Sequence, residues 1–176
     1  MNKGFTLIEI TVAIVIMTIG IVGIYSLVPK ITSVASTNNN NFIASQLAKE
    51  GAEIIRNIRD GNWLSDNNFD NELTNGDYLI QYNSQTPITY ADQFLKIDSS
   101  GFYNYEEGEN TKFKRKIIIS HPEVHILNVK VQVSWLGKGS PFEVQNELYD
   151  WKWIKKWLIP NYFNWPIRVK ILNSKS

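Results

Sequence analysis

The sequence predicts an α+β fold in which one long N-terminal helix packs on an antiparallel β-sheet, and two observations support this. An almost wholly apolar stretch at residues 5–28 leads into a segment, residues 42–60, whose apolar side chains recur every three or four residues. From residue 62 onward, apolar and polar residues alternate, as in strands with one buried face. A helix followed by a run of strands is typical of the α+β class.

The apolar stretch has the length of a membrane-spanning helix, because about 20 such residues cross the hydrocarbon core of a bilayer. Its one ionisable side chain is Glu9, and a charge inside a membrane costs at least about 2.5 kcal/mol, so Glu9 requires a partner. The alternatives are a secretory signal peptide or a signal anchor with an isolated glutamate. A secretory signal would end its apolar region within about 15 residues at a small-residue cleavage site, and none is evident here.

Beyond the apolar stretch, the pattern predicts a helix that continues to residue 60. Pro29 is expected to kink it, residues 38–41, all asparagine, are expected to form a joint, and Gly61 is expected to end it. The predicted core-facing stripe of this second half comprises Ile43, Leu47, Gly51, Ile54, Ile55 and Ile58.

Six segments in the second half of the chain read as strands. The clearest is residues 129–135, where three valines and a tryptophan alternate with polar residues, and residues 142–148 are expected to return antiparallel to it. The predicted strands are residues 77–82, 93–97, 102–105, 113–119, 129–135 and 142–148.

Composition excludes several classes of function. The formal net charge of +1 gives no strong field that would favour nucleic acid. The absence of cysteine excludes thiol catalysis, cysteine-ligated metals and disulfides. No spacing places a nucleophile beside a base or pairs two carboxylates in the manner of an active site. The sequence therefore predicts a protein that is not an enzyme and that holds no cofactor.

The N-terminus, Met-Asn-Lys-Gly followed by Phe-Thr-Leu-Ile-Glu, resembles the prepilin signal of type IV pilins and pseudopilins. The resemblance implies cleavage by a membrane peptidase between Gly4 and Phe5 and N-methylation of the new terminal residue, Phe5. Glu9 then becomes the fifth residue of the mature chain. Its carboxylate would pair with the Phe5 α-amine of a neighbouring subunit, because a buried charge is tolerated when paired. Glu9 is thus the expected assembly residue, which sets the register between subunits.

The same resemblance implies an inner-membrane protein with a single crossing and its C-terminal domain outside the cytoplasm, which later enters a surface or periplasmic filament. The expected partners are a prepilin peptidase and methyltransferase, other pilins or pseudopilins, and an inner-membrane assembly platform. The expected parts are a leader (1–4), a transmembrane or filament-core helix (5–28), its amphipathic continuation (29–61), a β-rich domain (62–152) and an aromatic, basic tail (153–176).

A narrower resemblance extends to the minor pilins called pilus modification proteins, and to the small minor pseudopilins of type II secretion. The segments that carry it are residues 47–51, 56–60, 113–115, 131–135 and 148–152. The functions left open are a minor pilin, a pseudopilus component for protein secretion, a DNA-uptake or adhesive module on a pilin anchor, and an enzyme tethered by such an anchor.

One stretch imitates a calcium-binding loop. Asp66, Asn68, Asp70 and Asp77 stand at positions one, three, five and twelve of the twelve-residue loop that binds calcium through oxygen ligands. Position six is Asn71 instead of glycine, and position twelve is an aspartate instead of the longer glutamate. The alternative is a turn rich in asparagine and aspartate.

Two further groups were weighed as binding sites. His121 and His125 have a spacing that binds zinc on a helix, but Pro122 and the strand pattern argue against a helix there. Lys114 and Lys116 would both point outward from their strand, which favours a solvated face over a DNA-binding groove. In the tail, tryptophan and lysine suit a lipid headgroup region, and the alternative is a last strand or helix that covers the domain's own core.

Overall fold

The structure is a computed structural model that describes residue 4, residues 6–137 and residues 140–152. Phe5, most of the predicted leader and the tail at 153–176 therefore lie outside the described residues. The chain divides into two compact units, residues 1–42 and residues 43–176, which are treated separately below.

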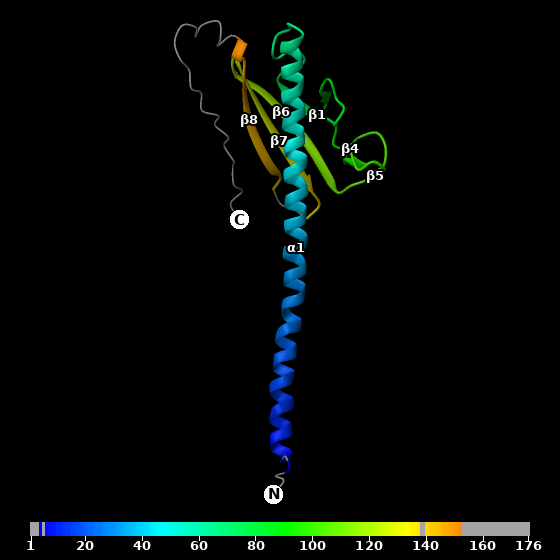
Figure 1. Cartoon of the computed structure of the whole chain (residues 1–176), viewed down its shortest axis with the longest axis vertical. Coiled ribbons are helices and arrows are strands. Elements are labelled where there is room, and N and C mark those ends of the chain that lie inside the picture. The colour runs from blue at the N-terminus through cyan, green and yellow to red at the C-terminus, as the bar shows by residue number, and fades with distance from the viewer. Residues whose placement is uncertain (1–3, 5, 138–139, 153–176) are drawn as a thin grey trace. The chain divides into compact units, whose positions relative to one another are not determined.

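Helix α1 (Leu7–Leu64) provides the regular structure among the described residues of the first unit (Figure 1). It runs through Pro29, and residues 38–41 are also helical. The interruption of the helix that was predicted at these four asparagines is therefore not observed. Asparagine lowers helix propensity by only about 0.7 kcal/mol per residue, which cooperative propagation from both sides offsets.

In the second unit, α1 ends at Leu64 and not at residue 60, so the predicted helix end is wrong by four residues. Trp63 explains the extension, because its side chain is buried in the core and the Arg59 guanidinium lies 4.4 Å from its ring centroid. These contacts outweigh the cost of about 1 kcal/mol for glycine inside a helix. The chain turns at Asp66, whose backbone is left-handed with φ of 56°.

The second unit contains two antiparallel sheets. The larger one has the order β2-β1-β6-β7-β8 and the smaller one the order β4-β3-β5. The strands are β1 (Gly76–Leu79), β2 (Ile88–Thr89), β3 (Lys96–Ile97), β4 (Tyr103–Asn104), β5 (Glu109–Asn110), β6 (Phe113–Glu123), β7 (Ile126–Trp135) and β8 (Phe142–Tyr149). The predicted fold class, one long helix packed on an antiparallel sheet, is confirmed.

The predicted strands differ in how well they match. The three long ones are confirmed, including the antiparallel return, with Val131 opposite Val144. The strand expected at 77–82 stops at Leu79, because the next carbonyl, that of Ile80, accepts a hydrogen bond from a side chain of β6. The strands expected at 93–97 and 102–105 each shorten to two residues.

The core lies where residues 43–64 of α1 cross one face of the larger sheet (Figure 1). The predicted stripe is confirmed, with Ile43 and Ile58 only partly buried, and three alanines join it: Ala44, Ala48 and Ala52. These small residues let the helix approach the sheet closely. A Cβ atom added at Gly51 would lie 3.0 Å from Ile117 Cδ1 and 3.3 Å from Val131 Cγ1.

Arg115 of β6 connects the helix, the sheet and the chain after β1. Its side chain is fully buried, and its guanidinium donates hydrogen bonds to the Leu47 carbonyl at 3.0 Å and the Ile80 carbonyl at 2.6 Å. The Glu50 carboxylate lies 3.3 Å from the same guanidinium and balances its charge. A buried cation is tolerated because it is paired and hydrogen-bonded.

Candidate functional site

At the start of helix α1, Thr6 and Glu9 form one half of a capping box. One Glu9 carboxylate oxygen accepts hydrogen bonds from the Thr6 backbone N–H and from its hydroxyl, each at 3.3 Å. The Thr6 carbonyl accepts the first helical hydrogen bonds, from the N–H groups of Glu9 and Ile10. The carboxylate therefore satisfies one backbone N–H, that of Thr6, which a helix start would otherwise leave without a partner. Sequence reasoning missed this role, although Thr-x-x-Glu is its signature.

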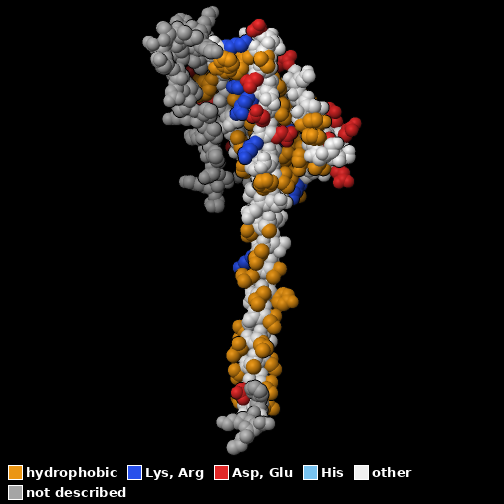
Figure 2. Space-filling model, viewed as in Figure 1, with side chains coloured by type: hydrophobic (Ala, Val, Ile, Leu, Met, Phe, Trp, Pro, Cys, Tyr) orange, Lys and Arg blue, Asp and Glu red, His pale blue; other side chains and the backbone are white. Residues whose placement is uncertain are grey.

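The first unit presents an apolar surface to its surroundings. Every described residue from 6 to 39 is exposed, and most of these between Leu7 and Val34 are large and hydrophobic (Figure 2). By length and composition, α1 contains one segment able to cross a membrane, near the N-terminus. Soluble proteins rarely leave an apolar patch of this extent uncovered, so the surface is suited to lipid or to other protein.

Five hydroxyl groups in and just beyond this apolar segment are satisfied by the helix itself. Each donates to a carbonyl three or four residues earlier: Thr11 to Leu7 and Ile8, Thr18 to Ile14 and Val15, Ser26 to Gly23, Thr32 to Val28, and Thr37 to Ser33. Self-satisfied polar groups lower the cost of an apolar environment. The charged groups of this segment are then only Glu9 near one end and Lys30 near the other.

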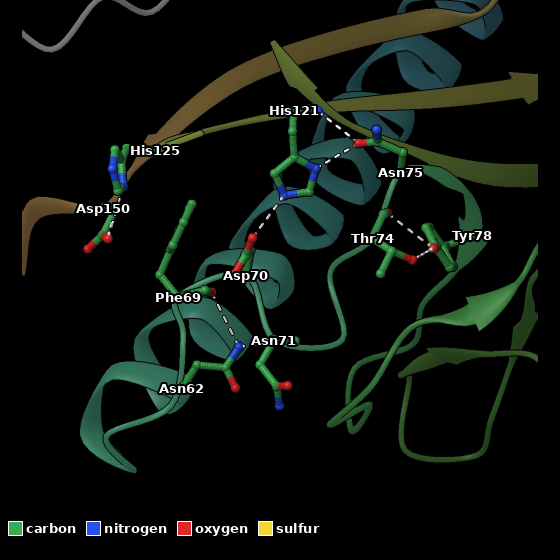
Figure 3. A network of polar contacts seen from close by, with 10 residues as sticks. All are labelled: Asn62, Phe69, Asp70, Asn71, Thr74, Asn75, Tyr78, His121, His125 and Asp150. Carbon is green, nitrogen blue, oxygen red and sulfur yellow. Dashed lines mark hydrogen bonds and ion pairs between the residues drawn. The ribbon is translucent and has the colours of Figure 1, made fainter. Parts of the chain in front are cut away.

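The four residues of the imitated calcium loop have separate neighbours in the structure. Asp66 Oδ1 lies 3.1 Å from Lys152 Nζ, and Asp77 pairs with Lys116 at 2.5 Å. Asp70 faces His121 at 3.6 Å (Figure 3). The Asn68 carbonyl accepts from the N–H of Asn71. Among the residues that the structure describes, no three His, Asp or Glu side chains gather in a group that could hold a metal ion.

The two histidines lie at one end of the sheet, as the strand pattern predicted, and not on a helix. His121 lies in β6, within the register irregularity between Ser120 and Glu123, and His125 lies in the connection to β7. Each faces a different carboxylate: His121 faces Asp70 at 3.6 Å, and His125 faces Asp150 at 3.4 Å.

The basic segment of β6 is balanced by carboxylates. Lys114 pairs with Asp92 at 2.7 Å and Lys116 with Asp77, while Arg115 between them is buried. The hydrogen bond from Lys114 holds the pKa of Asp92 below its ordinary value. These pairs leave little positive charge for a phosphate backbone, which DNA binding would need.

Comparison with known proteins identifies the N-terminal segment. Residues 1–25 match the family model described as the prokaryotic N-terminal methylation motif. No curated protein and no solved structure shows significant similarity to the chain. The motif implies processing by prepilin peptidase and assembly with other pilins, and the apolar helix fits a single-pass inner-membrane anchor. A methylation motif on a long apolar helix, joined to a helix-on-sheet domain, is consistent with a type IV pilin-like protein.

Proposed function

We propose that the chain is a minor pilin or pseudopilin, a structural subunit made as an inner-membrane precursor and assembled into a pilus-like filament. The observation that carries this proposal is the methylation motif at residues 1–25, at the start of a helix whose apolar side chains are all exposed between Leu7 and Val34. A helix that leaves lipid for a filament core of similar polarity would lose little free energy, because both environments are apolar.

The proposed processing follows from the motif. A prepilin peptidase cuts between Gly4 and Phe5, and the new α-amine of Phe5 is methylated. Gly4 is exposed and precedes the helix, which begins at Leu7.

The proposed register device is Glu9. In the single chain its carboxylate accepts hydrogen bonds from Thr6, at 3.3 Å each, which are long enough to be exchanged for a stronger partner. The cationic α-amine of Phe5 from a neighbouring subunit is such a partner, since hydrogen bonds between charged groups are roughly twice as strong as neutral ones. Heterologous contacts of this kind propagate into filaments when the rotation between subunits does not close a ring.

The alternatives differ in what the second unit would do. A DNA-uptake module is disfavoured because the lysines of β6 are paired with Asp92 and Asp77. A pseudopilus component of type II secretion shares the same anchor and the same processing. The genomic neighbours separate it from a pilus subunit, since a secretin operon indicates secretion and pilus genes indicate a pilus.

The first test is the intact mass of the protein extracted from membranes of cells with and without the prepilin peptidase. The expected mature species begins at methylated Phe5 in the first cells, and the full precursor from Met1 accumulates in the second. A Gly4→Val variant should remain uncleaved in both, because a β-branched residue would obstruct the cleavage position. A Gly23→Ala variant, also in the apolar segment, is the matched control and should be processed normally. Cleavage elsewhere, or retention of Met1 with the peptidase present, would exclude the proposal.

A further inference from the structure

The connection between α1 and β1, residues 65–75 and here called the α1–β1 loop, is held in a strained conformation. Asp66 and Glu72 have left-handed backbones with φ of 56° and 63°, which cost non-glycine residues conformational energy. Such strain persists only when surrounding contacts hold it. Two contacts are apolar, because Phe69 and Leu73 are buried in the core.

Polar contacts hold the loop from both sides. From the helix, the Asn62 side-chain amide donates to the Phe69 carbonyl at 3.3 Å and the Asn71 carbonyl at 2.9 Å. From the sheet, His121 at the end of β6 contacts the loop at two places, Asn75 and Asp70 (Figure 3).

The contact with Asn75 determines which ring nitrogen of His121 carries a hydrogen. The backbone N–H of His121 donates to Asn75 Oδ1 at 2.9 Å, so this atom is the amide oxygen, an acceptor. The His121 ring nitrogen Nδ1 lies 2.7 Å from the same oxygen and must therefore be a donor. A neutral His121 would thus carry its proton on Nδ1, and its Nε2 would present a lone pair.

That Nε2 atom lies 3.6 Å from a carboxylate oxygen of Asp70 and is buried without a hydrogen-bond partner. A lone pair facing a carboxylate is repelled, whereas an Nε2–H of an imidazolium is attracted. Only the doubly protonated ring satisfies Asn75 and Asp70 together.

We propose that His121 is a pH-responsive clamp that fastens the α1–β1 loop to the sheet through Asn75 and Asp70. When the ring carries both protons, the clamp is complete. As the pH rises and Nε2 loses its proton, the contact with Asp70 becomes repulsive, and the strained loop opens more often. Histidine charge changes in the pH range met outside a cell. The inference does not depend on the chain being a filament subunit.

The other charged groups near the clamp are engaged elsewhere or exposed. Asp66 pairs with Lys152, Asp77 pairs with Lys116, and Asp150 faces His125. The carboxylates of Glu72, in the loop, and Glu123, two residues beyond His121, are exposed. Among the described residues, Asp70 is therefore the charged group that faces the His121 ring within 4.0 Å.

The test is amide hydrogen exchange of the full chain in detergent micelles at about pH 5.5 and about pH 7.5, corrected for intrinsic exchange. We expect opening of residues 65–75 to increase about two- to fivefold at the higher pH, the effect of a partly exposed ion pair. His121→Gln and Asp70→Asn should each remove the increase. His125→Gln, which changes the neighbouring histidine, should retain it. Nitrogen-15 spectra of the neutral His121 ring should show the proton on Nδ1.

Several outcomes would overturn the clamp. They are unchanged exchange of the loop in the parent protein, a pH response that persists in His121→Gln, and a neutral ring protonated on Nε2. Loss of the response in His125→Gln alone would assign it to the other histidine. Should His121→Gln fail to fold, Asp70→Asn still decides, because that side chain is partly exposed and outside the core.

Discussion

Two parts of the same helix use their apolar residues in opposite ways. In residues 7–34, most of the large side chains are Ile, Val and Leu, they lie around the whole helix, and all are exposed. In residues 43–64, the apolar side chains form one stripe, and Ala44, Ala48, Gly51 and Ala52 are buried against the sheet. The surface of the first part is typical of a helix in apolar surroundings. The surface of the second part is typical of a helix packed within its own domain.

This difference shows that residue size separates the two roles as clearly as hydrophobicity does. Small residues let a helix approach a sheet, and the space they leave admits the buried Arg115 side chain beside Leu47 and Glu50. The apolar first part has no such pattern, and most of its Ser and Thr hydroxyls donate to backbone carbonyls of the same helix. The predictions below test each part separately, beginning with the largest effect.

Replacing Glu9 should abolish assembly while leaving the second unit intact. In Glu9→Leu, the α-amine of a neighbouring Phe5 would be buried without its counter-ion, at a cost of about 3–5 kcal/mol, so filament yield should fall on the order of a hundredfold or more. Sheared filaments are quantified by immunoblot, with thermal unfolding of the purified chain as the check on folding. Glu9→Asp, which keeps a shorter carboxylate, should retain part of the yield. Normal assembly of Glu9→Leu would remove Glu9 from the proposed register.

Replacing Arg115, unlike replacing Glu9, should destabilise the second unit. Arg115→Met fills similar volume but leaves the Ile80 carbonyl without its donor, so the free energy of unfolding should fall by about 3 kcal/mol. Urea unfolding of the full chain in micelles measures it.

The matched control for this prediction is Glu50→Gln. Its carboxylate is about one-third exposed, so solvent compensates for the lost charge and the expected loss is below about 1 kcal/mol. Equal losses in both variants would mean that the ion pair, and not the carbonyl contacts, fastens the helix to the sheet.

Much of this fold follows from periodicity. The helix stripe and the three long strands were predictable because each has a repeating apolar pattern long enough to outweigh local noise. The capping box was also present in the sequence as Thr6 and Glu9. The burial of Arg115 was also predictable, because alternation places this residue on the same face as Phe113 and Ile117.

The parts of the fold and of the candidate site that were not predicted depend on contacts between segments that are distant in the sequence. The two-residue strand β3 is held beside β6 by the hydrogen bond between the Leu95 N–H and the Phe113 carbonyl, which no local pattern encodes. The spacing at Asp66–Asp77 could not reveal that lysines at positions 116 and 152 engage two of the four side chains. A prediction from spacing alone omits such distant partners.

Two glycines in the second part of the helix test whether small residues are needed for the helix to approach the sheet closely. At Gly51, an added Cβ meets Ile117 and Val131, so Gly51→Ala should lower the free energy of unfolding by about 1 kcal/mol. At Gly61, an added Cβ would meet no atom within 4 Å beyond its own stretch of helix, so Gly61→Ala should raise the free energy of unfolding by up to about 1 kcal/mol through helix propensity. Unfolding in urea compares the two. Similar effects at both positions would mean that the helix does not need its small residues to reach the sheet.

The smallest expected effect concerns Tyr105, whose hydroxyl donates to the Arg115 carbonyl at 3.2 Å. Burial raises the pKa of Tyr105 above its ordinary value of 10.0, and the nearby Arg115 cation only partly opposes this. Because the folded pKa is raised, the contribution of Tyr105 to stability is complete below about pH 10 and is lost as the pH rises through the folded pKa. Tyr105→Phe should cost about 1 kcal/mol at about pH 8, the value of one hydrogen bond.

The pH dependence distinguishes this buried hydroxyl from one that merely fills space. The stability difference between the parent and Tyr105→Phe should narrow as the pH rises past about 10, because only the parent must keep a buried phenol protonated. Urea midpoints between about pH 8 and about pH 11 measure it, with Tyr25→Phe, in the exposed first part of the helix, as the control that should show no change. A constant difference across this range would mean that Tyr105 ionises as readily in the folded protein as in the unfolded chain. The core next to the second part of the helix would then be more hydrated than the burial of Arg115 implies.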